Sequence, residues 1–194
     1  MSSANALTVM DAIKHDHAEL KEYYENILGA NDVDSKIRWQ NQFTWELARH
    51  SIGEELVVYP AMEKHLGNTG KQMADRDRTE HNKRRWKTQV KQLLHKFQGL
   101  SPSDSAFRPT LESLWSELSK HIDEEETQDL PALEKALPEG DSQALSKSFG
   151  RTKMFVPTRS HPAAPDKPPF ETVAGLMAAP IDKLSDLFRR FPLG

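Results

Sequence analysis

The amino-acid sequence predicts an all-α fold, in the form of an up-down-up-down four-helix bundle. Three observations support this fold class. Apolar residues recur at the three- and four-residue spacing of a helix in four long segments. The connections between these segments are short, as in a bundle of antiparallel helices. The chain also has no alternating run of β-branched residues and no Asn-Gly or Asp-Gly turn of the kind that joins two strands.

The first two helices are predicted over residues 7–29 and 33–59. Each carries an apolar stripe at helical spacing. Pro60 has no backbone N–H to donate, so it is expected to end or kink the second helix, with a further turn or two over residues 61–66. The stripe residues are Ile13, Leu20, Tyr24 and Ile27 in the first helix, and Trp39, Phe43, Leu47 and Val57 in the second.

The third helix is predicted over residues 70–98, and the fourth from the segment 101–104 to about Asp129, with Pro131 just beyond it. The segment 101–104 has the composition of a helix start. Its serine can cap the helix, its proline suits the first helical position, and Asp104 can reach back as in a capping box.

The composition changes after residue 150. The prolines that follow predict an extended linker, and the last residues predict a short amphipathic helix. We therefore expect residues 1–150 to form the bundle and residues 151–194 to form a Pro-rich linker with an amphipathic C-terminal arm. This arm is expected to pack back on the bundle or to dock to a partner or a membrane surface. The prolines are Pro157, Pro162, Pro165, Pro168 and Pro169.

The bulk composition excludes several classes of site. The 194 residues include no cysteine, which excludes disulfides, thiolate metal sites and cysteine nucleophiles. The net charge is −3 with basic residues scattered among acidic ones, so no nucleic-acid partner is predicted. No apolar run reaches the ~20 residues of a membrane span, and the first residues lack the pattern of a signal peptide. A cytoplasmic location is the simplest expectation.

An internal repeat divides the predicted bundle into two related hairpins. The segment from His50 to Leu66 recurs from His121 to Leu137, and eight residues match in register: His, Glu, Glu, Pro, Ala, Glu, Lys and Leu. Fainter echoes are an Asp-His pair near the start of the first hairpin and a Glu-His pair in the third helix. Two such hairpins packed about a pseudo-twofold axis would bring the equivalent faces of the second and fourth helices together across the core.

The repeat places polar residues where a core is expected. His50 and Glu54 lie four residues apart, about 40° around a helix, and both fall on the apolar stripe, as do His121 and Glu125. His17 falls on the stripe of the first helix. A buried glutamate without a partner costs several kcal/mol or takes up a proton. A pair of metal ions explains this set, because imidazole and carboxylate are good ligands for iron. Hydrogen-bonded His–Glu pairs are the alternative.

Residues next to this set are expected to lie elsewhere. Glu55 and Glu126 are ~100° further around their helices, so we expect them to face solvent or to support the ligands from behind. His15 is ~200° from His17 and is expected to point outward.

This pattern resembles the hemerythrin-like (HHE cation-binding) family over about residues 7–137. The family has one histidine in the first helix, His-x-x-x-Glu in the second, a histidine in the third and His-x-x-x-Glu in the fourth. The resemblance implies a hemerythrin-like bundle with two irons per chain, joined by an oxo or hydroxo bridge, while manganese and zinc rank behind iron. The residues at its ligand positions are His17, His50, Glu54, His81, His121 and Glu125.

The chain departs from the oxygen carriers of this family in its third and fourth helices. The carriers have His-x-x-x-His in the third helix, whereas Arg85 follows His81 here and Asp77 precedes it at that spacing. The missing histidine would open a coordination position, unless Asp77 joins the ligands. The carriers also place an aspartate five residues after the last histidine, a position that Glu126 occupies here. Glu125 is therefore the predicted ligand, with Glu126 as the alternative.

His81 lies off the apolar stripe of its own helix. The stripe around Trp86 and Val90 extrapolates back to Thr79 rather than to His81. A π-bulge between His81 and Trp86 would restore the alignment. Alternatively, polar groups of this helix line the site.

Three functions fit this ligand set. The first is a non-haem di-iron protein that binds dioxygen, iron or a related small ligand such as nitric oxide. The second is an O2-dependent di-iron oxidoreductase, an oxidase or oxygenase that acts on a small organic substrate at the open position. The third is a metal-stabilised interaction module whose arm docks a partner. A ferritin-like site is excluded, because it requires Glu-x-x-His on two helices, and structural zinc ordinarily takes four ligands.

Overall fold

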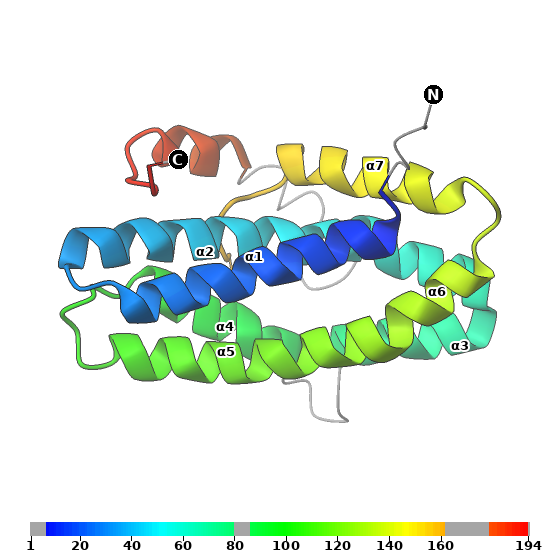
Figure 1. Cartoon of the computed structure of the whole chain (residues 1–194), viewed down its shortest axis with the longest axis horizontal. Helices are drawn as coiled ribbons and strands as arrows, with labels where there is room; N and C mark the ends of the chain where they lie inside the picture. Colours follow the sequence, from blue (N-terminus) through cyan, green and yellow to red (C-terminus); the bar gives the residue numbers. More distant parts are fainter. Residues whose placement is uncertain (1–6, 80–85, 162–178, 194) are drawn as a thin grey trace.

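The protein is an all-α helical bundle, as predicted (Figure 1). The computed structural model describes residues 7–79, 86–161 and 179–193, without the side chains of residues 76–79 and 86–89. Within these residues all regular structure is helical. No described helix is long and apolar enough to cross a membrane.

The first hairpin consists of α1 (Val9–Gly29) and α2 (Val33–Gly53). Side chains cap both helices at their N-termini. Thr8 and Asp11 form a capping box on α1, and Asp32 accepts a hydrogen bond of 2.8 Å from the backbone N–H of Ser35 on α2. The two helices pack side by side along their length (Figure 1).

The second helix does not end at Pro60. It passes from α2 through a π-helical segment, η1 (Glu54–Val58), into α3 (Tyr59–Thr79). The N–H of Tyr59 bonds to the carbonyl of Glu54, one residue further back than in an α-helix. This shift of the hydrogen-bond ladder just before the proline carries the helix past a residue that cannot donate. The chain turns at Gly67, whose φ of 57° and ψ of −131° break the helical geometry within α3.

The second hairpin repeats this construction. It consists of α4 (Trp86–Gln98), α5 (Phe107–Glu124), the π-helical segment η2 (Glu125–Asp129) and α6 (Leu130–Ala136). The segment η2 lies at the same position of the internal repeat as η1. The two copies of the repeat therefore share the π-helical backbone conformation as well as the sequence. The predicted end near residue 129 is wrong, because a π turn again carries the helix past Pro131, which occupies its first turn in α6.

The predicted start of the fourth helix at residues 101–104 is also wrong. Asp104 does reach back to Ser101, whose backbone N–H donates to Oδ2 of Asp104 at 2.7 Å. The contact closes a turn that precedes the helix, and α5 begins at Phe107.

A further helix, α7 (Asp141–Phe155), packs alongside α1 and α2 on the outside of the bundle (Figure 1). This helix was not predicted from the sequence. It begins after Gly140, which has a φ of 84°. The helix runs through residue 150, where the change in composition suggested a boundary, and the division into residues 1–150 and 151–194 stays a prediction.

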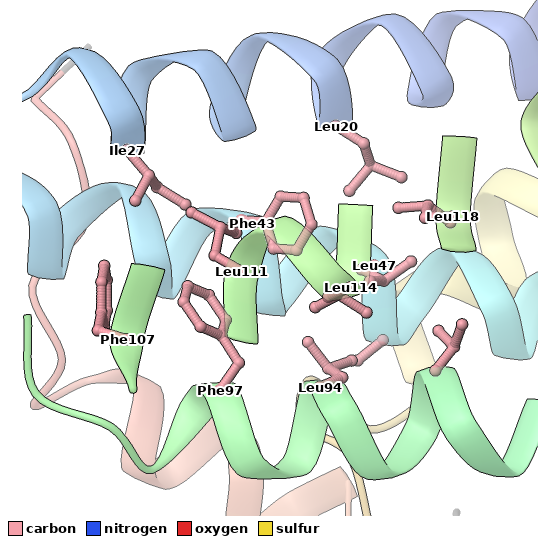
Figure 2. Packing of buried hydrophobic residues seen from close by; sticks show 12 residues of the cluster. Leu20, Ile27, Phe43, Leu47, Leu94, Phe97, Phe107, Leu111, Leu114 and Leu118 are labelled. Carbon is pink, nitrogen blue, oxygen red and sulfur yellow. The ribbon is translucent and has the colours of Figure 1, made fainter. Parts of the chain in front are cut away.

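Two apolar clusters fill the bundle. One joins α1, α2, α4 and α5, and Figure 2 shows Leu20 and Ile27 pointing from α1 toward Phe43, Leu111 and the side chains around them. The other joins the start of α1 to η1, α3, α6 and α7. The residues of the predicted metal site fall between the two clusters along three runs of chain. These runs are α1, the passage from α2 through η1 into α3, and the passage from α5 through η2 into α6.

The last described residues contact the outer face of α2. Residues 179–186 form a short helix, in which Oδ2 of Asp182 accepts hydrogen bonds from the backbone N–H groups of Thr158 and Arg159, each at 3.1 Å. Beyond this helix, Arg38 of α2 donates to the carbonyl of Phe191 at 2.8 Å. Five large apolar side chains of this segment are exposed: Ile181, Leu184, Leu187, Phe188 and Leu193.

Candidate metal centre

Four buried titratable side chains converge at the middle of the bundle. They are His17 of α1, His50 of α2, Glu54 of η1 and Glu125 of η2, and one ligand atom from each lies within 4.8 Å of all the others. Each side chain belongs to a residue that is no more than 3% exposed. The four residues therefore form a buried polar layer between the two apolar clusters.

His121 stands at the edge of this group. Its Nε2 lies 3.3 Å from Oε1 of Glu125, and the residue is buried. Of the six residues predicted as ligands, the structure thus brings five together. The sixth, His81, lies outside the described residues, as do Arg85 and the side chain of Asp77.

The two π-helical segments begin at the glutamates of the site. Glu54 opens η1 and Glu125 opens η2. A π turn takes more residues than an α turn, so it widens the inward face of the helix. Glu55 is buried at 5% exposure, so it does not face solvent, while its support of the ligands from behind stays a prediction.

These π turns were not predicted in the second and fourth helices. A signal was present in the sequence, since both copies of the repeat carry a Glu-Glu doublet followed by a proline. The π-bulge that was predicted lies between His81 and Trp86, outside the described residues.

A carboxylate holds the outer nitrogen of each of two histidines. Nδ1 of His17 lies 2.9 Å from Oε1 of Glu126, and Nδ1 of His50 lies 3.1 Å from Oδ2 of Asp16. Such contacts fix the tautomer and the ring orientation of a metal-binding histidine. They leave Nε2 facing inward, 3.5 Å from Glu125 in the case of His17 and 3.1 Å from Glu54 in the case of His50.

Glu126 and Asp16 thus share one role. Glu126 was the alternative ligand, but its carboxylate contacts the back of His17. Asp16 was not predicted to take part. The Asp16-His17 doublet and the Glu125-Glu126 doublet are the sequence signal for this arrangement, because each places a carboxylate directly beside a ligand position.

Several buried polar atoms at the centre have no hydrogen-bond partner among the residues that the structure describes. They are Nε2 of His17, Oε1 of Glu54 and both side-chain oxygens of Glu125. The distances between them permit attraction, but the atoms are not aligned as hydrogen bonds. Buried polar atoms are nearly always satisfied, so simple His–Glu hydrogen-bonded pairs do not explain this geometry. Imidazole nitrogen and carboxylate oxygen aimed at a common point suit a transition-metal ion.

In the metal-free protein, protons on the histidines balance the negative charge of the carboxylates. Burial opposes ionisation of His50, but the charge of Glu54 and the contact with Asp16 outweigh it and raise the pKa of His50 to about 10. Burial likewise opposes the charge on His17, whose pKa is raised by Glu125 and Glu126. The pKa of Glu125 is lowered against its burial by His121 and His17. A metal ion binding here would replace these protons.

A second acidic group lies directly behind His50. Asp16, Glu19 and Glu46 bring one oxygen each within 4.8 Å of one another. The ammonium group of Lys153 on α7 donates to Asp16 and to Glu46, and Arg49 also donates to Glu46. The side chains of Lys153 and Arg49 therefore balance the negative charge of Asp16 and Glu46.

Comparisons with known proteins agree with this geometry. A sequence model of the hemerythrin HHE cation binding domain matches residues 8–133. An uncharacterised hemerythrin-like protein of Schizosaccharomyces pombe is 57% identical over 184 residues, which cover 95% of this chain and 88% of the relative. A DNA nickase of Nostoc sp. is 22% identical over 158 residues, which cover 81% of this chain but 42% of that protein.

A solved structure shares the fold. The crystal structure of a hemerythrin HHE cation binding domain-containing protein from Mycobacterium kansasii matches with a TM-score of 0.62 at 19% sequence identity, covering 76% of this chain and 86% of that one. The family match ends at residue 133, before α7 begins.

Proposed function

Because the chain belongs to the hemerythrin HHE cation-binding family, we propose that its central His/Glu cluster holds two iron ions and binds dioxygen, iron or a related small ligand. The observation that carries this proposal is the set of buried ligand atoms on His17, Glu54 and Glu125 that have no hydrogen-bond partner within residues 7–79, 86–161 and 179–193. A non-haem iron pair in such a site supplies reversible redox chemistry and open coordination positions for a small ligand.

The two hairpins contribute equivalent ligands. Glu54 and Glu125 come from the same position of the repeat and both reach the centre, so they would be among the residues that hold the metal. His17 and His50 stand on one side, with ring centroids 4.9 Å apart. His121 stands beside Glu125, and His81 stays the predicted ligand of the third helix.

The chain's own residues restrict what the site can bind. Apolar clusters lie on both sides of the polar layer along the bundle, and the converging ligands are almost fully buried. Electrostatic interactions between such buried groups are stronger than at the protein surface. Burial of this degree favours a ligand of the size of dioxygen or nitric oxide over a larger organic molecule.

The other two functions rest on the third helix and on the C-terminal arm. An oxidase or oxygenase requires the open position that the third helix would leave near His81 and Arg85. An interaction module requires a partner for the C-terminal arm. Both stay predictions, and the enzymatic one is tested by oxygen consumption with small organic substrates.

Ligand uptake by the reduced protein tests the proposed function. The iron-loaded protein is reduced anaerobically and titrated with dioxygen and with nitric oxide while its visible spectrum is recorded. Saturable uptake, with release of the ligand when its pressure is lowered, supports the proposal. No spectral change with either ligand would contradict it, and sustained consumption of dioxygen with an organic substrate would favour the oxidase.

A further inference from the structure

We propose that Lys153 is a positioning residue of the metal centre, acting through Asp16 on His50. This inference rests on the proposed function, because it concerns how α7 holds a metal ligand. It goes beyond the family match, which ends before α7. It also assigns a role to a helix that the sequence analysis did not predict.

A continuous chain of contacts links α7 to the ligand. The ammonium group of Lys153 donates to Oδ2 of Asp16, and the same oxygen lies 3.1 Å from Nδ1 of His50. Lys153 is 9% exposed and Asp16 is 5% exposed, so solvent screens this chain of charges only weakly. The inward Nε2 of His50 then faces Glu54.

The backbone is shaped to admit α7 at this point. Gly53 precedes Glu54, and a Cβ atom on Gly53 would stand 2.7 Å from Cε2 of Phe149 and 3.3 Å from Cγ of Lys153. The ring of Phe149 in turn packs edge-on against the ring of His50, with centroids 5.9 Å apart. Two neighbouring turns of α7 therefore contact the His50 segment, one by packing and one by charge.

The lysine prevents a conflict between buried carboxylates. Asp16 lies close to Glu19 and Glu46, and like charges at this range repel strongly where solvent is scarce. Lys153 bridges Asp16 and Glu46, and Tyr23 donates to Glu19 at 3.1 Å. Without the lysine, Asp16 would be pushed away from its place behind His50, and the imidazole would lose the contact that orients it.

The test compares iron binding and redox potential across variants of α7. Lys153→Met removes the charge and keeps a side chain of similar length, whereas Lys153→Arg keeps the charge. Lys147→Met is the matched control, because Lys147 is exposed on the same helix. The readouts are the Fe(II) dissociation constant from competition with a chelator, the midpoint potential of the iron centre, and the thermal midpoint of the metal-free protein.

The expected result separates positioning from mere stabilisation. Lys153→Met should weaken Fe(II) binding about tenfold or more and shift the midpoint potential to more negative values, because a nearby positive charge is lost. Lys153→Arg should recover a large part of both, and Lys147→Met should match the wild type. A Lys153→Met protein that loses thermal stability but keeps the wild-type dissociation constant and potential would overturn the proposal.

A double-mutant cycle tests the route through Asp16 and covers the case in which Lys153→Met does not fold. Asp16→Asn should itself weaken Fe(II) binding, and Lys153→Met should have little further effect in that background, because the two act on one contact and one of the carboxylates that the lysine neutralises is then uncharged. Additive effects would overturn the route through Asp16. If the wild-type protein binds no iron, the proposed function fails, and this inference fails with it; normal wild-type binding with unaffected variants contradicts only the inference.

Discussion

Gly53 lies so close to Phe149 that a Cβ atom built on the glycine would stand 2.7 Å from Cε2 of the ring. Replacing a helical glycine by alanine ordinarily stabilises a protein by about 0.5–1 kcal/mol. Here the added methyl group would push α7 away from α2, so we expect Gly53→Ala to lower the free energy of unfolding by about 1–3 kcal/mol. Denaturant unfolding of the metal-free protein measures this change.

Gly150 is the matched control for this substitution. It lies inside α7, is exposed, and a Cβ atom added there meets nothing within 4 Å. Gly150→Ala should therefore stabilise the protein by about 0.5–1 kcal/mol. Effects of the same sign for both substitutions would show that α7 does not pack on Gly53.

His17 and His15 offer a second matched pair, two residues apart and on nearly opposite faces of α1. The side chain of His17 is 2% exposed and faces Glu125, whereas that of His15 is 69% exposed. His17→Ala should weaken iron binding by about tenfold or more, while His15→Ala should leave it unchanged. Iron content after dialysis against a chelator measures both. Equal retention of iron by the two variants would remove His17 from the ligand set.

The pH dependence of the metal-free protein follows from Asp16 and His50. Burial opposes the charge on each, but their mutual contact and neighbouring charges lower the pKa of Asp16 to about 2, from 3.8, and raise that of His50 to about 10, from 6.5. The contribution of Asp16 is present above pH 3.8 and is lost as the pH falls through 2. The contribution of His50 is present below pH 6.5 and is lost as the pH rises through 10.

The thermal midpoint of the metal-free protein should therefore fall as the pH rises above 6.5. Iron binding should strengthen over the same interval, because the metal competes with the proton on His50. Calorimetry of the metal-free protein between pH 5 and pH 9 measures the first effect, and His50→Gln should lose much of this slope. A midpoint that rises with pH in the wild type would contradict the assignment of the proton to His50.

Asp182 holds the last described helix to the segment after α7. Its Oδ2 accepts from two backbone N–H groups, and the imidazole of His161 lies 2.9 Å from the same atom. Hydrogen bonds to a charged group contribute about 1.5–3 kcal/mol each. Asp182→Ala should therefore loosen this segment locally and speed its cleavage by a protease, without changing iron content. The exposed Asp123→Ala is the control, and equal cleavage rates for both variants would argue against the anchor.

The features of the fold that follow from the helical spacing of apolar residues could be predicted from the sequence. The apolar stripes located the bundle helices, and the His-x-x-x-Glu repeat located His50, Glu54, His121 and Glu125 in the core. Hydrophobic spacing reports which face of a helix is buried, and ligands on that face are therefore predictable. His17 was found by the same argument.

Other features depended on local geometry that spacing does not report. Pro60 was expected to end or kink its helix, and the fourth helix was expected to end before Pro131. The rule for proline assumes an α-helical ladder, and the π turns before both prolines were not foreseen. Helix α7 was missed because its apolar pattern is weak and its contacts are long-range. Lys153 could not be assigned from sequence, since its partners lie more than a hundred residues away.

Metal analysis of the purified protein, together with its visible spectrum, tests the central claim most directly. The spectrum is recorded in air, after reduction, and after renewed exposure to air. The account predicts two iron ions per chain and oxo-bridge charge-transfer bands that disappear on reduction and return with oxygen. A protein without iron, or with a single zinc ion per chain, would contradict it and would leave the buried His/Glu cluster as part of a scaffold.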